Sequence, residues 1–175
     1  MVNTKEIYKK ANMIIANAGT RNMEEVARQL GIKVYFEDNY KDLLGMYTYS
    51  YKTRAIFVND RLDEYMTQMV IAHEIGHDML HRELAKNGSM KEFGLFKMMK
   101  NNTEYEANAF ASHLLIYTDA FLELARDGRS ISEIACIMNT DINIALIKWK
   151  ELDTIGYDLH APMDTKGDFM KNIKV

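Results

Sequence analysis

Residues 73–77 read His-Glu-Ile-Gly-His, inside a run from residue 60 to 85 that has the composition of one long helix. On a helix, His73 and His77 lie one turn apart on the same face, so their rings can bind one Zn²⁺ at about 2.0–2.1 Å. Glu74 is rotated about 100° from that pair, where it can act as a base on a water molecule but not as a third ligand. Chance alone gives roughly 0.01 matches to His-Glu-x-x-His in a chain of this composition. The pattern therefore predicts the centre of a zinc hydrolase site.

The residues around the motif favour a helix. Asn59 or Asp60 can cap its N-terminus, and no proline interrupts the run. Gly76 costs about 1 kcal/mol relative to alanine inside a helix, which close approach of another backbone would explain. The apolar face is wide, and it is formed by Leu62, Tyr65, Met66, Met69, Val70 and Ile71. Such a face indicates burial on most sides. A core helix with two hydrogen-bonded histidines is the alternative.

A third ligand is expected further along the chain, because catalytic zinc sites have three protein ligands and one open position. In TEYEANAFASHLL (103–115), Glu104 is the best donor, and Asn108 lies one turn further on the same face. Asn108 is then placed to accept a hydrogen bond from the ring of a ligating histidine. Glu106 points about 200° away from Glu104 and ranks second as a ligand. The alternative for both glutamates is a solvent-exposed helix charge.

The remaining histidines and the one cysteine are less informative. His81 continues the series, but it lies roughly 12 Å along the axis from His73, too far to share its ion. We expect His81 to support a ligating histidine from outside the coordination sphere or to pack at the helix end. His113 is expected to face elsewhere, and His160 has no assignable role. Cys136 is the single cysteine, so the chain has no disulfide framework, and Cys136 is expected to be buried.

Hydrophobic periodicity predicts an α+β fold: helices first, then a small sheet, then the helix that carries the motif. The predicted elements are helices at 4–18 and 22–30, strands at 32–37, 44–51 and 54–58, the helix from 60, and helices at 103–117, 118–127, 130–138 and 141–155. The strands are expected to form a three-stranded antiparallel sheet packed on the motif helix. Residues 85–102 are expected to be a mobile loop or lid with one short helix.

The length of 175 residues predicts a single domain, residues 1–175, with a sizeable core. Within it, we distinguish a core region of residues 1–117, a C-terminal helical region of residues 118–160 and a tail of residues 161–175. The net charge of −3 gives no general attraction to nucleic acid. No apolar run is long enough to span a membrane, and the N-terminus lacks a secretory signal. A cytoplasmic protein without a membrane partner is expected.

HEIGHDMLH (73–81) followed by EYEANAFASHLL (104–115) resembles the ImmA/IrrE metallopeptidases, single-domain zincins of bacteria and their mobile elements. The resemblance implies a minimal zincin-like core in residues 1–117 and a C-terminal helical bundle similar to a helix-turn-helix. It implies that His73, His77 and Glu104 bind zinc and that Glu74 is the general base. Members cleave, or otherwise antagonise, a helix-turn-helix repressor encoded nearby. The resemblance thus implies a zinc endopeptidase that acts as an anti-repressor in a prophage, a mobile element or a stress response.

Several points stay open at this level. Tyr47, Tyr49, Tyr51 and His81 are all candidates for the group that stabilises the developing oxyanion. The substrate is expected to add as an extended strand to an exposed edge of the small sheet.

Two other functions compete with proteolysis. A zincin-shaped anti-repressor could bind and sequester its repressor without cutting it, and it would keep the same ligand set. A DNA-binding regulator could use residues 130–155, but its recognition helix would carry only Lys148 and Lys150 as cations beside several acids. Direct DNA binding is therefore disfavoured.

Overall fold

The computed structural model describes residues 3–86, 90–92 and 102–159. The chain divides into two compact units, Met1–Leu115 and Ile116–Val175. The boundary expected after residue 117 lies close to this division. That the whole chain forms one domain remains a prediction.

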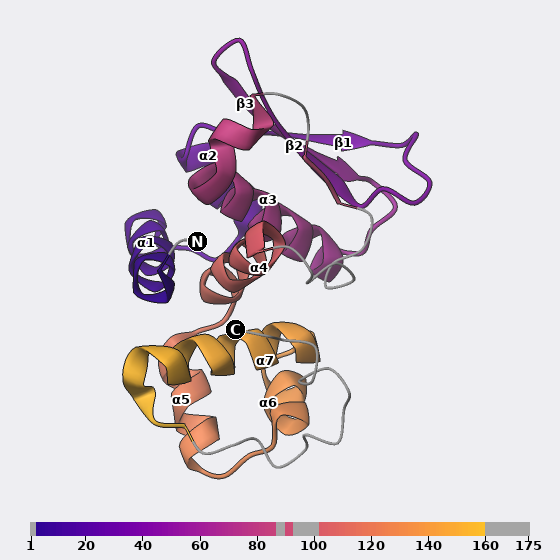
Figure 1. The fold of residues 1–175 in the computed structure, drawn as a ribbon. Helices are drawn as coiled ribbons and strands as arrows, with labels where there is room; N and C mark the ends of the chain where they lie inside the picture. Colours follow the sequence, from indigo (N-terminus) through magenta and orange to yellow (C-terminus); the bar gives the residue numbers. More distant parts are fainter. Residues whose placement is uncertain (1–2, 87–89, 93–101, 160–175) are drawn as a thin grey trace. The chain divides into compact units, whose positions relative to one another are not determined.

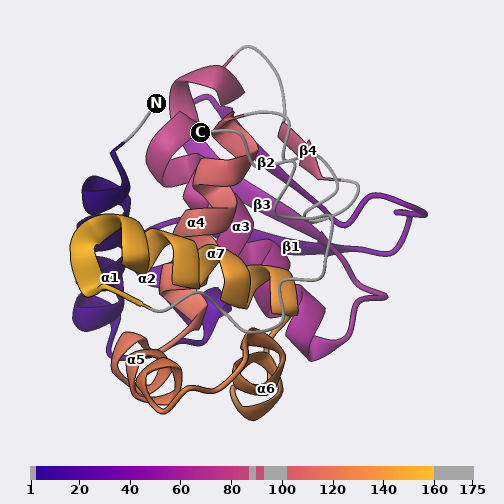
Figure 2. The same ribbon diagram turned by 60° about the horizontal axis from the view of Figure 1, so that its bottom comes forward.

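The first unit contains a sheet whose strand order is β1-β3-β2-β4, which Figure 2 shows. The strands are β1 (Lys33–Glu37), β2 (Gly45–Ser50), β3 (Thr53–Asn59) and β4 (Met90–Glu92). β2 and β3 form the expected antiparallel hairpin. Its turn residues Tyr51 and Lys52 have φ angles of 47° and 62°, the left-handed conformation that matches a two-residue turn to the twist of the strands.

The prediction of three antiparallel strands is wrong in two respects, although the α+β class and the packing of the sheet on the motif helix are confirmed. First, β1 pairs with β3 in parallel, with Lys33 opposite Ala55. The chain reverses direction between β1 and β2 and again between β2 and β3, so β1 and β3 run the same way. β3 then lies between β1 and β2 in the sheet. Second, β4 adds to β2 in a segment expected to be a loop or lid. The rest of that segment, residues 87–89 and 93–101, lies outside the described residues.

Four helices accompany the sheet: α1 (Thr4–Ala18), α2 (Met23–Gln29), α3 (Glu64–Ala85) and α4 (Asn102–Leu115). α3 packs against the sheet, and α4 lies alongside α3 (Figure 1). The cap of α3 is Asp63, whose side chain accepts a hydrogen bond from the Met66 amide at 2.8 Å. The predicted cap Asn59 is used elsewhere, because its amide donates to the carbonyl oxygens of Tyr40 and Leu43 at 3.3 and 3.0 Å.

α3 is buried continuously from Met69 to Asp78, as its wide apolar face predicts. The predicted backbone approach at Gly76 is confirmed. A Cβ placed on Gly76 would lie 2.9 Å from the carbonyl oxygen of Ala107 and 3.0 Å from its Cα. Only glycine lets α3 and α4 come this close, because the contacting atoms are backbone and cannot rotate away.

The buried carboxylate of Asp78 joins the sheet to α3. The hydroxyl of Tyr47 in β2 donates to Oδ1 of Asp78 at 2.5 Å, and Nη1 of Arg54 in β3 donates to Oδ2 at 3.0 Å. Arg82, one turn further along α3, donates to both carboxylate oxygens at 3.1 and 2.9 Å. A buried charge is tolerated only when it is paired and hydrogen-bonded, so this cluster ties the register of the hairpin to α3.

The described part of the second unit contains α5 (Thr118–Arg126), α6 (Ile131–Ile137), α7 (Ile142–Leu152) and a π-helical turn, η1 (Asp153–Tyr157). α6 starts with a capping box in which the side chains of Ser130 and Glu133 each bind the other's backbone amide. Cys136 is exposed, so the expectation that it is buried is wrong. α6 buries the face formed by Ile131, Ile134 and Ala135, and the next residue is rotated about 100° away from it.

Among the described residues, no helix combines the length and the apolar character that crossing a bilayer requires.

Candidate metal centre

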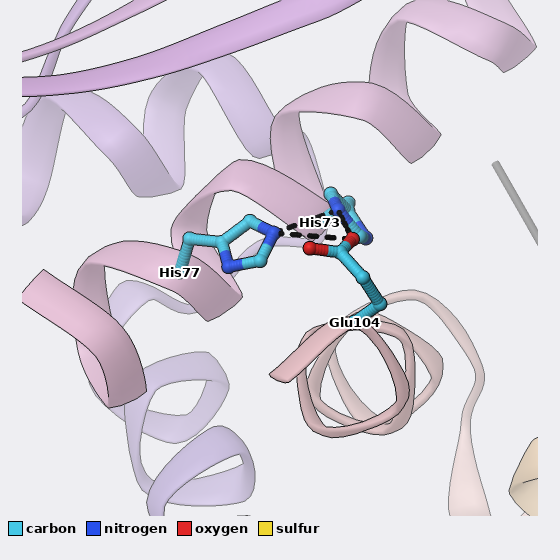
Figure 3. A group of neighbouring side chains, drawn as sticks. All are labelled: His73, His77 and Glu104. Carbon is cyan, nitrogen blue, oxygen red and sulfur yellow. Dashed lines mark hydrogen bonds and ion pairs between the residues drawn. The ribbon is translucent and has the colours of Figure 1, made fainter. Parts of the chain in front are cut away.

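Three side chains from two helices of the first unit meet at one point (Figure 3). His73 and His77 project from α3, and Glu104 projects from the first turn of α4. The Nε2 atoms of the two histidines are 2.9 Å apart. Oε2 of Glu104 lies 3.3 Å from Nε2 of His73 and 3.6 Å from Nε2 of His77. The structure thus brings together the three residues that the sequence nominated as ligands.

The spacing of these three atoms fits a metal ion. Ligands at the corners of a tetrahedron with bonds of about 2.0–2.1 Å stand roughly 3.3 Å from one another. The three observed separations, 2.9, 3.3 and 3.6 Å, lie around that value. Within the part of the chain that the structure describes, this is the one group of three or more His, Cys, Asp or Glu residues with ligand atoms so close together. Two imidazoles and a carboxylate are also the donor set of a typical catalytic zinc site.

The ring of His73 is held in one orientation. Its Nδ1 lies 2.9 Å from Oδ1 of Asn108, which is buried one turn after Glu104 on α4. An amide oxygen only accepts, so Nδ1 of His73 carries the proton and its Nε2 keeps a lone pair. That lone pair faces Glu104 and His77. Asn108 therefore lies where the helical spacing placed it.

The ring of His77 has a different neighbour. Its Nδ1 lies 3.2 Å from Nδ1 of His81, and Nε2 of His81 lies 2.9 Å from Oε2 of Glu106. Glu106, which ranked second as a ligand, is thus outside the group of three, because it projects from another side of α4. Sequence reasoning missed its contact with His81. The only signal in the sequence was that Glu106 lies two residues after Glu104 and so projects from a different side of the helix. This spacing does not show which residue the Glu106 carboxylate contacts.

Burial and hydrogen bonding set the charges of the group. Burial lowers the pKa of His77 to about 4, although the neighbouring Glu104 carboxylate acts in the opposite direction. Burial alone would raise the pKa of Glu104, but the neighbouring rings of His73 and His77 outweigh that effect and hold the pKa well below its usual range. At neutral pH the site therefore presents a neutral His77 and an ionised Glu104. These are the protonation states that metal ligation needs.

Glu74 is almost completely buried, with 1% of its surface exposed, and it lies under the start of β2. A Cβ placed on Gly45 would lie 3.3 Å from Oε1 of Glu74 and would overlap Cγ1 of Val70. The first residue of β2 must therefore be small for the strand to pass this close to the carboxylate. Glu74 is enclosed between α3 and the sheet, next in sequence to His73.

The structure narrows the candidates for stabilising an oxyanion. The hydroxyl of Tyr47 donates to Asp78, and burial together with that hydrogen bond raises its pKa. Both ring nitrogens of His81 have neighbours within hydrogen-bonding distance. Tyr51 is 100% exposed in the hairpin turn, and the Tyr49 ring faces the cationic groups of Arg82 and Lys86 at 5.9 and 6.0 Å. The two groups already engaged, Tyr47 and His81, are the least suited of the four.

Another described histidine, His113, takes no part in this group. His113 is fully buried and makes an edge-to-face contact with the ring of Tyr8, with 5.2 Å between ring centroids. It faces α1 and not the group of three, as expected. His160 and the predicted tail, residues 161–175, lie outside the described residues.

Comparison with known proteins identifies the family of this chain. A family model described as the IrrE N-terminal-like domain of peptidase family M78 matches residues 27–145, which include α3 and α4. The chain is 30% identical over 163 residues to Metallopeptidase ImmA of Bacillus subtilis strain 168, covering 90% of this chain and 92% of the relative. It is 29% identical over 135 residues to the Uncharacterized immunity region protein 2 of Bacillus phage phi105, covering 77% and 84% of the two chains. The chain therefore belongs to the IrrE N-terminal-like family of metallopeptidases.

Proposed function

We propose that this protein is a zinc-dependent endopeptidase of the cytoplasm that cleaves a transcriptional repressor with a helix-turn-helix domain. The observation that carries the proposal is the triangle formed by His73, His77 and Glu104, whose dimensions fit a tetrahedral Zn²⁺ site. A carboxylate suited to general base chemistry, Glu74, follows the first of these residues. One relative is named for a phage immunity region and another as a metallopeptidase, which supports an anti-repressor role in a mobile element or stress response.

Each residue of the site has a distinct role in this proposal. His73, His77 and Glu104 would hold the ion, while Asn108 and His81 would orient the two rings. Bound Zn²⁺ supplies a Lewis acid that polarises a peptide carbonyl and makes water more acidic. The Glu74 carboxylate accepts the proton of the attacking water and returns it to the leaving amine. Because both histidines are at most 2% exposed, bulk water is kept from that side of the site.

The most accessible member of the group indicates where a substrate would enter. The Glu104 side chain keeps 22% of its surface exposed, whereas the two histidines are buried. Gly45, the residue of β2 next to Glu74, pairs with Glu92 of β4, and β4 is the outermost of the described strands on this side of the sheet. A substrate segment would add as an extended strand along the outer edge of β4, where backbone pairing presents one peptide bond to the site.

The second unit gives little support to DNA binding as the function. Of the two cations on the expected recognition helix, Lys148 is fully buried, with its Nζ 2.9 Å from Oγ1 of Thr118. Burial lowers the pKa of the other, Lys150. A buried ammonium group such as that of Lys148 cannot contact phosphates, which are the main source of affinity for nucleic acid. A protein partner is therefore the better proposal.

Coexpression with each helix-turn-helix repressor encoded beside the gene tests the proposal, with mass spectrometry of the repressor afterwards. Wild type should produce defined fragments, and a chelator or the Glu74→Gln change should abolish them while zinc binding persists in the variant. Glu83→Gln is the matched control, because the side chain of Glu83 is 78% exposed on the same helix. This variant should cleave the repressor normally. Repression relieved equally by wild type and Glu74→Gln, with the repressor intact, would establish sequestration in place of proteolysis.

A further inference from the structure

The side of His77 that faces away from Glu104 is occupied by two further polar residues. His81 Nδ1 lies 3.2 Å from His77 Nδ1, and Glu106 Oε2 lies 2.9 Å from His81 Nε2. His81 and Glu106 are buried, with 7% and 5% of their surfaces exposed. The three side chains form a row from the candidate metal centre on α3 to a carboxylate on α4.

Elementary hydrogen-bond chemistry gives this row a direction. A carboxylate only accepts, so Nε2 of His81 carries a proton and donates it to Glu106. A neutral imidazole has one N–H, so Nδ1 of His81 must then be an acceptor. The donor to it is Nδ1–H of His77, which leaves Nε2 of His77 with its lone pair toward His73 and Glu104. One carboxylate therefore specifies, through one intermediate ring, which nitrogen of His77 is available to a metal.

The backbone of α3 accommodates this arrangement. His81 is the residue at which α3 departs from helical dihedral angles, with φ −128° and ψ 18°. The backbone at His81 is therefore not regular α-helix, and in this conformation the ring makes both of its contacts. A histidine that merely filled space at the end of a helix would not require two contacts of hydrogen-bonding length on opposite sides of its ring.

The two candidate histidine ligands are supported unequally. Nδ1 of His73 donates directly to a neutral amide oxygen, that of Asn108. Nδ1 of His77 is linked through His81 to a carboxyl side chain, that of Glu106. Hydrogen bonding to a carboxylate raises the basicity of a ligating imidazole and fixes its tautomer more strongly than an amide does.

We propose that Glu106 is a positioning residue that acts through His81 to hold His77 in the tautomer whose Nε2 lone pair faces His73 and Glu104. This inference rests on the proposed metal site, but it concerns the proton on His77 and can be tested without metal or substrate. The inference assigns a role to Glu106, the carboxylate of α4 that lies outside the group formed by His73, His77 and Glu104.

The central experiment compares wild type with Glu106→Gln, which keeps the size of the side chain and removes its charge. Long-range ¹H–¹⁵N spectra of the histidine rings report the tautomer of each ring, and five histidines are few enough to assign by substitution. In the metal-free protein, His77 should hold its proton on Nδ1 in wild type. It should become a mixture of tautomers in Glu106→Gln, because the glutamine amide can either accept from His81 or donate to it, whereas a carboxylate only accepts. Zinc affinity, measured by competition with a chromophoric chelator, should fall about 10- to 100-fold.

Asn108→Leu provides the matched control, because it removes the partner of the other ring. It should alter the Nδ1 signal of His73 and leave that of His77 unchanged, whereas Glu106→Gln should do the opposite. A merely structural effect of either change would move both rings together. Glu106→Asp serves if Glu106→Gln does not fold, since it keeps the charge but shortens its reach, and the His77 signal should again change.

Two results would overturn the inference. One is an unchanged His77 tautomer with unchanged zinc affinity in a folded Glu106 variant. The other is a wild-type His77 that carries its proton on Nε2. If wild type binds no zinc at all, the proposed function fails, while the metal-free spectra still decide the role of Glu106.

Discussion

Gly76 of α3 faces the backbone of Ala107 of α4 so closely that a Cβ on Gly76 would lie 2.9 Å from the Ala107 carbonyl oxygen. This contact lies close in sequence to all three residues of the candidate metal centre. His73 and His77 are on either side of Gly76, and Glu104 precedes Ala107 by three residues on α4. The distance between the two helices at this point therefore determines whether the carboxylate reaches the imidazoles.

Gly76→Ala should force α3 and α4 apart. Alanine would favour the helix by about 1 kcal/mol, but overpacking against fixed backbone atoms typically costs about 1–3 kcal/mol. We expect a lower melting temperature and weaker zinc binding, measured by thermal unfolding and by chelator competition. Glu83→Ala at an exposed position of the same helix is the control and should change neither. A Gly76→Ala protein with wild-type zinc affinity would show that the close approach does not position Glu104.

Gly45→Ala should disturb the other side of the site. The new methyl group would overlap Cγ1 of Val70 and crowd Oε1 of Glu74, so β2 or the carboxylate must shift. We expect unfolding free energy to fall by about 1–3 kcal/mol, with zinc affinity close to wild type because no ligand is touched. Cleavage of the repressor should fall further than zinc binding. Equal losses of both would instead mean that the change acts on the whole fold.

Glu104→Gln should remove one candidate ligand while keeping the shape of the side chain. Residues outside the coordination sphere already change metal affinity about 10- to 100-fold, so loss of a ligand should exceed about 100-fold. Titration calorimetry with Zn²⁺ measures this directly, and Glu83→Gln provides the control for loss of one negative charge on the protein. Retention of wild-type affinity would remove Glu104 from the ligand set and would leave Glu106 as the carboxylate to test.

Tyr47→Phe should lower stability without a specific effect on cleavage. The hydroxyl donates to the buried carboxylate of Asp78 at 2.5 Å, and a hydrogen bond to a charged group contributes about 1.5–3 kcal/mol. Chemical denaturation should show a loss of that size. Tyr49→Phe on the same strand is the matched control, because its ring keeps its place facing Arg82. Normal stability with abolished cleavage in Tyr47→Phe would identify Tyr47 as the oxyanion donor after all.

Local patterns predicted the local structure well. The helix at 4–18 matches α1, and the strands at 44–51 and 54–58 match β2 and β3 to within a residue or so. The strands depend on local periodicity, and helices α1 and α2 depend also on their N-caps, Asn3 and Asn22, which act within a few residues. The N-cap of α3 was misjudged between Asn59 and Asp60, because the side chain of Asn59 is used by a loop distant in sequence.

The convergence of His73 and His77 follows from the sequence alone, because residues four apart on any helix share a face. The same argument placed Asn108 one turn after Glu104. The meeting of these two helices, the parallel pairing of β1 with β3, the addition of β4 and the contact between His81 and Glu106 were settled only by the tertiary structure. Each of these joins segments far apart in the chain, and helical or strand periodicity carries no information about which distant face a residue will meet.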